Sequence, residues 1–276
     1  IAADTKIEFR LARKDPDGNC TMGVTRVYSS ATNHGDESAK AVAGSWDNSK
    51  YLNIWTVKSM SESGVAGYSY YPGTAPEGGD GIILLYDYIS RALTHEAGHY
   101  LNLPHPWGST NEPGQADNCD IDDGIEDTPN TIGHTSCVLN DVTCGSLDNV
   151  QNFMDYSYCY RMFTNGQAAV MRATLNSSEA NRNNLCSASN RIATGTDDDY
   201  IDEECAPIAD FSQSKKMICN GATVSYNDHT YNTTSVDYRM WSFEGGEPAT
   251  SGEESPNVLY NEGGRFTTEL YVENSV

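Results

Sequence analysis

The chain has 276 residues and a formal net charge of −22, from 39 acidic against 17 basic side chains. This length is enough for one good-sized domain and a second small one. The charge argues against nucleic acid or an anionic membrane as partner, because both require basic patches, and no apolar run is long enough to span a bilayer.

Eight cysteines, an even number, favour disulfides made in an oxidising compartment over a set of reduced buried thiols. The sequence contains no CxxC pair, so nothing indicates a cysteine-rich zinc site. Ile1 opens directly into domain sequence, so we expect a mature form of a soluble secreted protein.

Three strands are predicted before residue 90. Apolar and polar residues alternate over residues 6–12, and residues 52–57 have the composition of a second strand. Residues 82–86 form a nearly continuous apolar run directly before a predicted helix. Such a run fits a strand, but it does not distinguish an edge strand from an ordinary buried one.

The stretch at residues 94–105, THEAGHYLNLPH, contains three of the six histidines. His95 and His99 lie on one face of a helix because they are four residues apart, and His105 reaches the same metal only if the chain turns back. Three imidazoles leave a fourth coordination position open, as in a catalytic zinc site. Glu96 is placed to act as general base. HExxH alone is weak evidence, since solvated surface histidines show it by chance; the third histidine makes it specific.

A loop at residues 117–128 is crowded with carboxylates. They repel one another unless a cation lies among them, and calcium takes six to eight oxygen ligands. The alternative is a merely solvated acidic loop. The oxygen-bearing residues are Asp117, Asp120, Asp122, Asp123, Glu126, Asp127 and Thr128.

Residues 152–156, NFMDY, place a methionine two residues before a tyrosine, and residues 167–175 are predicted to form a helix. Small, polar and acidic residues at 187–204 are typical of an exposed linker. From residue 205 onwards, short alternating segments separated by Gly and Asn turns predict a small β-sandwich. Its strands are expected at residues 209–211, 223–226, 238–243 and 267–272.

These motifs resemble the pappalysin family of metzincin zinc metalloproteases (peptidase M43), especially its small bacterial members of the ulilysin and mirolysin type. The zinc stretch and NFMDY are the specific part, since metzincins combine HExxHxxGxxH with a later turn that places Met beneath the zinc. The resemblance covers about the first two thirds of the chain. Weaker matches support it at residues 4–12, 51–55, 67–68, 71–73 and 127–129.

The resemblance implies an α+β metzincin catalytic domain over residues 1–186, with a mixed twisted sheet, an active-site helix and a Met turn. In metzincins the strand before that helix is a sheet edge, to which the substrate adds as an antiparallel strand; we expect residues 82–86 to do this. After the acidic linker at 187–204, residues 205–276 resemble a PKD-type β-sandwich, an accessory module. Trp241 in this module is expected in the core rather than on a binding surface.

The resemblance also implies roles for individual residues. Met154 would form a floor below the zinc without binding it. Tyr156 would donate a hydrogen bond to the oxyanion, and a merely packed tyrosine is the alternative. Calcium is expected near the acidic loop, with Asp123 and Thr128 as the best matches to the family motif and Asp122 and Glu126 as further ligands.

Four disulfides are expected. The resemblance implies two, which would staple the loop-rich stretch between the zinc helix and the Met turn. The other two are our preference among the remaining cysteines, one inside the second domain and one tying the two ends of the first, and sequence alone does not settle that connectivity. In this order, the pairs are Cys119–Cys144 and Cys137–Cys159, then Cys205–Cys219 and Cys20–Cys186.

Two departures from the family pattern affect the site. The family has Gly where this chain has Asn102; Asn is the next most tolerant residue for the left-handed backbone required there, and Pro104 prevents the helix from continuing. After the Met turn, residues 157–162 lack the acidic pair that close relatives have in the wall of the pocket for the residue after the scissile bond. The relatives' preference for Arg or Lys near the cut is therefore not carried over.

The sequence thus predicts a secreted, extracellular zinc endopeptidase, monomeric and bacterial, that acts on protein or peptide substrates. A zinc-bound water would attack the scissile carbonyl, with Glu96 as general base and then general acid. Two alternatives remain: a surface-binding protein whose metal site is a relic, and a zinc hydrolase with a non-peptide substrate. The intact motifs argue against the first, and the edge strand and Met turn argue against the second. His34, His134 and His229 show no partner pattern and are expected to be surface or structural residues.

Overall fold

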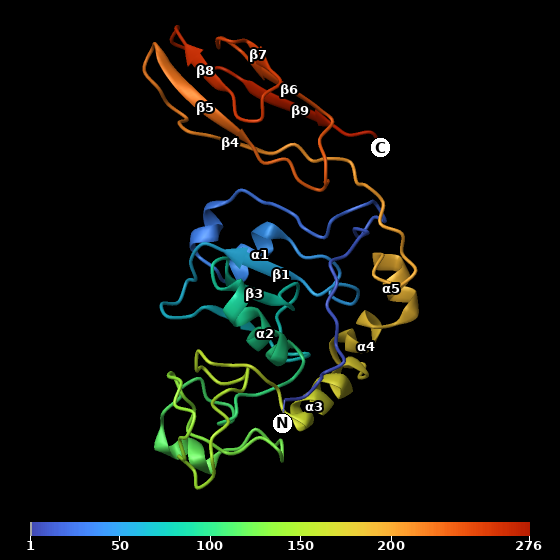
Figure 1. The fold of residues 1–276 in the computed structure, drawn as a ribbon, viewed down its shortest axis with the longest axis vertical. Coiled ribbons are helices and arrows are strands. Elements are labelled where there is room, and N and C mark those ends of the chain that lie inside the picture. Colours follow the sequence, from blue (N-terminus) through green and yellow to red (C-terminus); the bar gives the residue numbers. More distant parts are fainter. Residues whose placement is uncertain (1) are drawn as a thin grey trace. The chain divides into compact units, whose positions relative to one another are not determined.

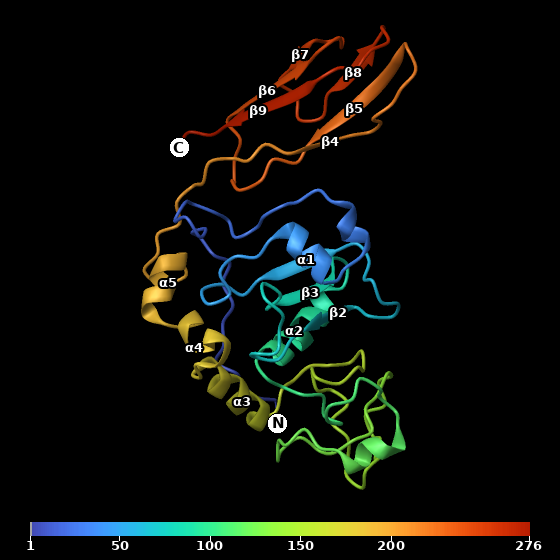
Figure 2. The same ribbon diagram turned by 180° about the vertical axis from the view of Figure 1, so that it is seen from behind.

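The computed structural model describes residues 2–276 and divides into two compact units (Figures 1 and 2). The first contains the chain up to Arg10 together with Thr25–Ala193, and the second contains Leu11–Val24 together with Thr194–Val276. The second unit therefore includes an N-terminal segment that the sequence did not indicate. Within residues 2–276, no helix has both the length and the apolar composition that crossing a membrane requires.

The sheet of the first unit has three strands in the order β1-β3-β2. β3 (Ile82–Leu85) is parallel to β1 (Ile54–Val57) and antiparallel to β2 (Gly67–Ser69). The expectation that the strand before the zinc helix is the edge is therefore wrong: β3 is central, and β2 is the antiparallel edge. A Cβ at Gly67 would lie 2.8 Å from the carbonyl oxygen of Ile83, so only glycine permits this close pairing.

The predicted strand at residues 6–12 is also absent. One-sided burial is found only over residues 3–7, where Ala3, Thr5 and Ile7 are half-buried and their neighbours exposed, whereas Phe9 and Leu11 of the predicted strand are exposed. The segment runs beside α3 rather than in a sheet (Figures 1 and 2): Arg172 Nη1 donates to the Thr5 carbonyl at 3.1 Å. Alternation of apolar and polar residues in the sequence therefore did not correspond to a strand with one buried face.

Short helices flank the sheet, namely η1 (Ser30–Asn33) and α1 (Glu37–Ala43). α1 is anchored by the buried Lys40, whose Nζ lies 2.8 Å from Glu37 and donates to the Gly79 carbonyl at 3.0 Å. The ammonium also lies over the ring of Tyr68, 4.5 Å from its centroid. A buried ammonium is tolerated here because a carboxylate, a carbonyl and an aromatic face surround it.

α2 (Ile89–Tyr100) packs against the sheet, and later helices complete the first unit. Arg182 joins these parts: its guanidinium binds both oxygens of Asp80, at 2.7 and 2.8 Å, and stacks 3.6 Å from the ring centroid of Tyr100 at the end of α2. The later helices are α3 (Asn165–Leu175), η3 (Glu179–Asn181), α4 (Arg182–Leu185) and α5 (Ala188–Thr194). α5 lies within the predicted linker at 187–204, so the start of that segment is helical.

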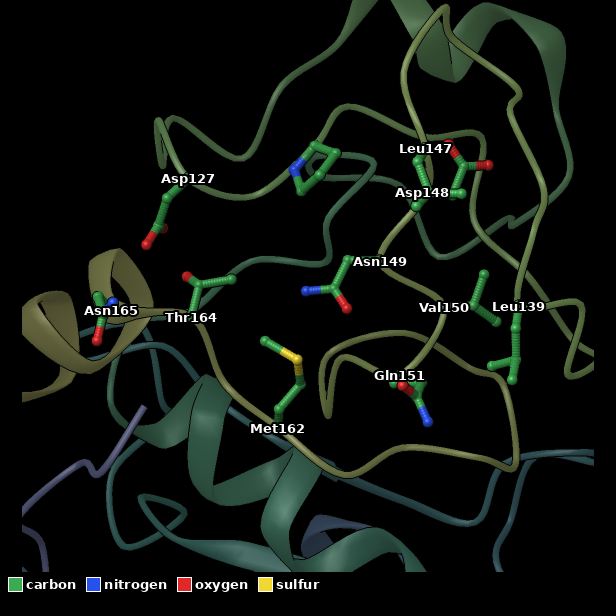
Figure 3. Close-up of a pocket in the computed structure, with 11 residues that line it drawn as sticks. Asp127, Leu139, Leu147, Asp148, Asn149, Val150, Gln151, Met162, Thr164 and Asn165 are labelled. Carbon is green, nitrogen blue, oxygen red and sulfur yellow. The ribbon is translucent and has the colours of Figure 1, made fainter. Parts of the chain in front are cut away.

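The stretch between α2 and α3 is mostly loop, with one short helix, η2 (Ala116–Asp120). Two disulfides cross it, Cys119–Cys144 and Cys137–Cys159, and these are the two pairs that the resemblance implied. The loops enclose an open pocket of about 480 Å³ (Figure 3). None of the zinc-motif residues lines it; its walls include Asp127, Asp148 and Met162.

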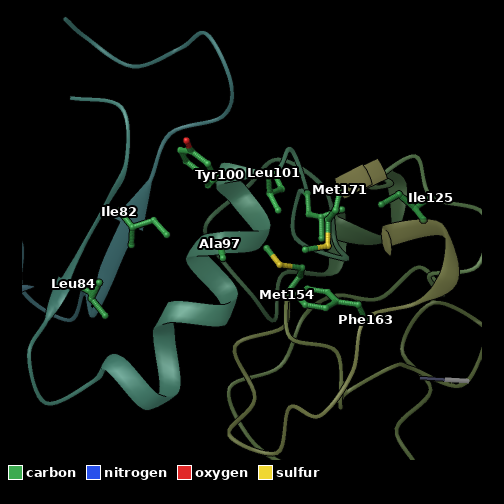
Figure 4. Close-up of a cluster of buried hydrophobic side chains, with 10 residues drawn as sticks. Ile82, Leu84, Ala97, Tyr100, Leu101, Ile125, Met154, Phe163 and Met171 are labelled. Atoms are coloured by element: carbon green, nitrogen blue, oxygen red, sulfur yellow. The ribbon is translucent and has the colours of Figure 1, made fainter. Parts of the chain in front are cut away.

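The main hydrophobic core joins the sheet, α2 and the loop region (Figure 4). Ile82 and Leu84 of β3 contribute from one side of α2, and Met154, Phe163 and Met171 from the other. All of these side chains are buried. The face of α2 that carries His95 and His99 is thus fixed relative to the segment NFMDY.

The second unit contains two three-stranded sheets, in the orders β4-β5-β8 and β7-β6-β9. One hydrophobic cluster draws on both, including Val224, Val258, Trp241 and Phe243. Trp241 is fully buried and donates its indole N–H to the Glu253 carbonyl at 2.8 Å, so the expected core position is confirmed. The strands are β4 (Phe211–Gln213), β5 (Ala222–Asp228), β6 (Tyr238–Phe243), β7 (Thr250–Ser251), β8 (Asn257–Tyr260) and β9 (Thr268–Glu273).

The third disulfide contradicts the two remaining disulfide predictions. Cys20 pairs with Cys205, with Cα atoms 5.3 Å apart, and Cys186 and Cys219 are exposed free thiols. The expected pairs Cys20–Cys186 and Cys205–Cys219 are therefore wrong. The reason is that Leu11–Val24 folds with the second unit, where Arg13 contacts Asp202 at 3.0 Å, instead of staying with the first.

Candidate metal centre

Three imidazoles converge in the first unit. Nε2 of His99 lies 3.0 Å from Nε2 of His95 and 3.2 Å from Nε2 of His105. His95 and His99 come from the same face of α2, while His105 comes from the segment after the helix. These atoms lie close enough to one another to share one metal ion.

The opposite nitrogen of each ring is bound to a backbone carbonyl. Nδ1 of His95 lies 2.8 Å from the carbonyl oxygen of Phe153, Nδ1 of His99 2.7 Å from that of Leu103, and Nδ1 of His105 3.1 Å from that of Thr110. A carbonyl only accepts, so each Nδ1 is the donor and each Nε2 presents a lone pair. Three lone pairs facing one another repel unless a cation lies between them, and second partners of this kind orient metal-binding histidines. The donor set therefore fits a zinc ion.

The end of α2 allows His105 to return to the site. Asn102 has a φ of 71°, which confirms the left-handed conformation expected there. The N–H of Leu103 donates to the carbonyl of Gly98 and that of Asn102 to the carbonyl of His99, both at 2.9 Å. This pair of hydrogen bonds is a Schellman motif, which ends a helix at a left-handed residue. It also turns the Leu103 carbonyl toward His99.

Burial controls the charges at the site. It lowers the pKa of His99 to about 4 and that of His105 to about 3, so both imidazoles are neutral at pH 7 and able to bind a metal. Burial likewise raises the pKa of Glu96 to about 8, although the backbone N–H of Ser69 in β2 opposes this by donating to the carboxylate. One oxygen of Glu96 is buried without a hydrogen-bond partner. A nearby cation would favour the ionised carboxylate.

Met154 is fully buried against α2 (Figure 4). Its sulfur occupies the space that a Cβ at Gly98 would need, so glycine permits the contact. Asn152 holds the segment: its side-chain oxygen accepts the Met154 N–H at 2.9 Å and Gln167 Nε2–H at 3.1 Å. Gln167 belongs to the capping box that begins α3.

Two aromatic rings surround His105. Trp107 is fully buried and stacks on His105, with ring centroids 4.5 Å apart and planes 8° apart. Tyr156 lies edge-on to His105 at 4.8 Å and 5.4 Å from His95, with 40% of its surface exposed. Tyr156 is therefore next to two of the three histidines and accessible from solvent.

The four expected calcium ligands differ in burial. Asp123 and Thr128 are buried, whereas Asp122 and Glu126 are exposed. Burial raises the pKa of Asp123 to about 7, with Asp122 adding to the effect, and one of its carboxylate oxygens has no hydrogen-bond partner.

Sequence reasoning missed Gly98, Trp107 and Gln167 as supports of the site. A small residue between the two helix histidines was a signal for close packing on that face. A tryptophan two residues after His105 was a signal for an aromatic partner. Gln167 gave no such signal in the sequence, because its hydrogen bond to Asn152 joins two separate segments of the chain.

A family comparison decides the assignment. The model of peptidase M43, described as Pregnancy-associated plasma protein-A, matches residues 35–176, more than half of the chain. The chain belongs to the peptidase M43 family. The matched M43 region contains the three histidines, Glu96, Met154 and Tyr156. Strands β4 to β9 of the second unit lie outside it.

The curated relatives are fungal proteins. An extracellular metalloprotease of Arthroderma otae is 28% identical over 182 residues, which cover 59% of this chain and 62% of that protein. One of Neurospora crassa is 32% identical over 153 residues, 48% of this chain and 50% of its own length. One of Trichophyton verrucosum is 28% identical over 181 residues, with 59% and 61% covered. The chain thus spans half to about three fifths of these relatives, and they do not support the expected bacterial origin.

Proposed function

We propose that this chain is a secreted zinc endopeptidase of the M43 family. The observation that supports it best is the convergence of three neutral, carbonyl-oriented imidazoles beside a buried glutamate. Relatives with 28–32% identity are named extracellular metalloproteases, and three disulfides fit an oxidising compartment. A single chain acting as a monomer on protein or peptide is the simplest form of the proposal.

Each side chain has a role in this proposal. His95, His99 and His105 would hold a zinc ion, which would supply Lewis-acid polarisation of the scissile carbonyl and lower the pKa of water. Glu96 accepts a proton from the attacking water and passes it to the leaving amine. The hydroxyl of Tyr156 donates a hydrogen bond to the oxyanion.

The substrate binds as an extended strand along β2. This edge replaces the one expected at residues 82–86, and it lies next to the site, because the N–H of Ser69 reaches Glu96. Main-chain pairing holds many sequences with few side-chain demands. Residues 157–162 contribute no acidic side chain to the pocket wall, so cleavage before Arg or Lys is not expected to dominate.

The decisive test is cleavage of a proteome-derived peptide library at neutral pH, with every cut site sequenced. Glu96→Ala is expected to keep zinc and fold but to lose activity by about 10²- to 10⁴-fold, the usual contribution of a general base and acid. Glu62→Ala, an exposed glutamate in a loop, serves as the matched control and keeps the wild-type rate. Equal cutting by the Glu96 variant would refute the mechanism.

Calcium is a further part of the proposal. The buried carboxylate of Asp123, with an unpartnered oxygen, and the neighbouring hydroxyl of Thr128 supply oxygens of the type that calcium prefers. Asp122 and Glu126 would complete the site only if they turn inward from their exposed positions. The second unit, with its two sheets and shared core, is proposed to be the PKD-like accessory module.

A further inference from the structure

A second cluster of metal-ligand atoms lies outside the three-histidine site. Nε2 of His134 is 3.2 Å from Oδ2 of Asp148 and 3.4 Å from Oδ2 of Asp141. These three ligand atoms lie within 4.8 Å of one another. His134 is 7% exposed and the Asp148 side chain is fully buried, whereas the Asp141 side chain is 40% exposed, so the group is open to solvent on the Asp141 side only.

The contacts do not behave as hydrogen bonds. His134 Nε2 is buried and has no hydrogen-bond partner, although two carboxylate oxygens are nearby. Ligand atoms that surround a tetrahedral ion at about 2.1 Å are about 3.4 Å apart, close to the 3.2 and 3.4 Å that separate His134 Nε2 from the two carboxylate oxygens. The same spacing relates the imidazoles of the first site.

The other side of the His134 ring has the support expected of a metal ligand. Its Nδ1 lies 3.2 Å from Oδ2 of Asp155, whose Oδ1 accepts the backbone N–H groups of His134 and Ser157 at 3.1 and 3.0 Å. A carboxylate behind the imidazole fixes the tautomer and directs the Nε2 lone pair outward. Thr143 Oγ1 donates to Asp148 Oδ2 at 2.7 Å and fixes that carboxylate as well.

We propose that His134, Asp141 and Asp148 bind a second zinc ion. Zinc suits a set of one imidazole and two carboxylates, whereas calcium requires six to eight oxygens. In Figure 3, Asp148 lies at the rim of the loop pocket with its carboxylate directed away from Asp127. The ion would fasten this disulfide-crossed loop region to Asp155, one residue from Met154 and Tyr156, and so hold the Met turn in place.

A metal-free cluster is the competing interpretation. A protonated His134 between Asp141, Asp148 and Asp155 would also neutralise the carboxylates. The two interpretations differ in zinc content rather than in fold, so zinc content is the measurement to make.

The experiment counts zinc per chain by inductively coupled plasma mass spectrometry after zinc loading and removal of free metal. The wild-type chain is expected to hold two zinc ions, and Asp148→Asn and Asp141→Asn one each. Asp120→Asn, an exposed acid of the same loop region, is the control and keeps two. A wild-type zinc content that neither Asp148→Asn nor Asp141→Asn lowers overturns the proposal.

A second measurement covers the case in which Asp148→Asn does not fold. His105→Gln, which disables the first site, should still bind one zinc and gain thermal stability when zinc is added, because the ion binds only the folded form. Adding Asp141→Asn, a change at a half-buried position, should abolish that gain. Loss of zinc response in His105→Gln alone overturns the second site. Failure of the proposed protease function gives a different result. If the three histidines hold no zinc, the wild type and His105→Gln contain the same amount of zinc.

Discussion

Asn102 illustrates how a single residue connects helix geometry to the cluster of three histidines. Its left-handed backbone allows two hydrogen bonds that end α2, and these bonds position the carbonyl that orients His99. Asparagine tolerates this conformation better than other non-glycine residues, but glycine adopts it without a steric penalty.

Replacing Asn102 with glycine should therefore increase stability. The expected gain in the free energy of unfolding is a few tenths to about 1 kcal/mol, because relief of backbone strain is partly offset by a more flexible unfolded chain. Asn102→Ala should decrease stability by a similar amount. Urea denaturation of the zinc-loaded protein measures both.

Asn183→Gly is the matched control, since this exposed residue lies inside helix α4. Glycine there should cost about 0.5–1 kcal/mol, the usual penalty in a helix. Destabilisation of equal size at both positions would show that Asn102 is not strained.

At the scale of elements, the start of α3 holds the segment around Met154. Gln167 closes the capping box with Thr164 and exchanges two hydrogen bonds with Asn152, at 2.9 and 3.1 Å. Asn152 in turn binds the N–H of Met154, next to the Phe153 carbonyl that orients His95. The helix, the segment around Met154 and His95 thus form one connected network.

Gln167→Ala should loosen this network. Loss of the cap and of bonds to a buried amide predicts a decrease of about 2–4 kcal/mol in the free energy of unfolding. Zinc affinity should fall about 10- to 100-fold, as is usual when the support of a metal ligand is removed. Zinc competition with a chromogenic chelator measures the affinity.

Gln115→Ala, an exposed glutamine outside the network, should change neither quantity. Unchanged zinc affinity in a destabilised Gln167→Ala protein would mean that α3 supports the fold but not the metal site.

At the scale of the whole molecule, stability depends on how buried acids are neutralised in a chain of net charge −22. Burial raises the pKa of Asp123 to about 7, against 3.8 for the unperturbed side chain. The folded state thus retains this proton over a range where the unfolded chain has lost it, so rising pH favours unfolding. Bound calcium would favour the ionised form and remove the effect.

Without calcium, and with zinc present, the unfolding free energy contributed by Asp123 should be fully present below about pH 4 and be lost as pH rises to about 7. The test is the difference between wild type and Asp123→Asn in urea denaturation from pH 4 to 8. Subtracting the two curves removes the titration of other groups. The wild type should lose stability relative to the variant as pH rises, and calcium should restore it. If the stabilities of wild type and Asp123→Asn changed in parallel with pH both with and without calcium, Asp123 would not be the group responsible for the pH dependence.

Interactions between residues close in sequence were predictable from the sequence. The spacing of His95, His99 and His105 predicted that these histidines form one cluster, since helix geometry places side chains four residues apart on one face. Asn102 could be assigned its backbone conformation because so few residue types adopt it. The helix at Asn165–Leu175 and the strand at Tyr238–Phe243 followed from periodicity, which is also local.

Interactions between residues distant in sequence were decided only by the tertiary structure. Alternation at residues 6–12 did not show that Phe9 and Leu11 stay exposed, and Cys20 could not reveal that its segment folds with Cys205. The same holds for β2 as the edge strand, for Gln167 beside Asn152, and for His134 between Asp141 and Asp148. Side-chain chemistry and local spacing can be read directly from the sequence. Which distant segments come into contact depends on how the whole chain buries its apolar surface.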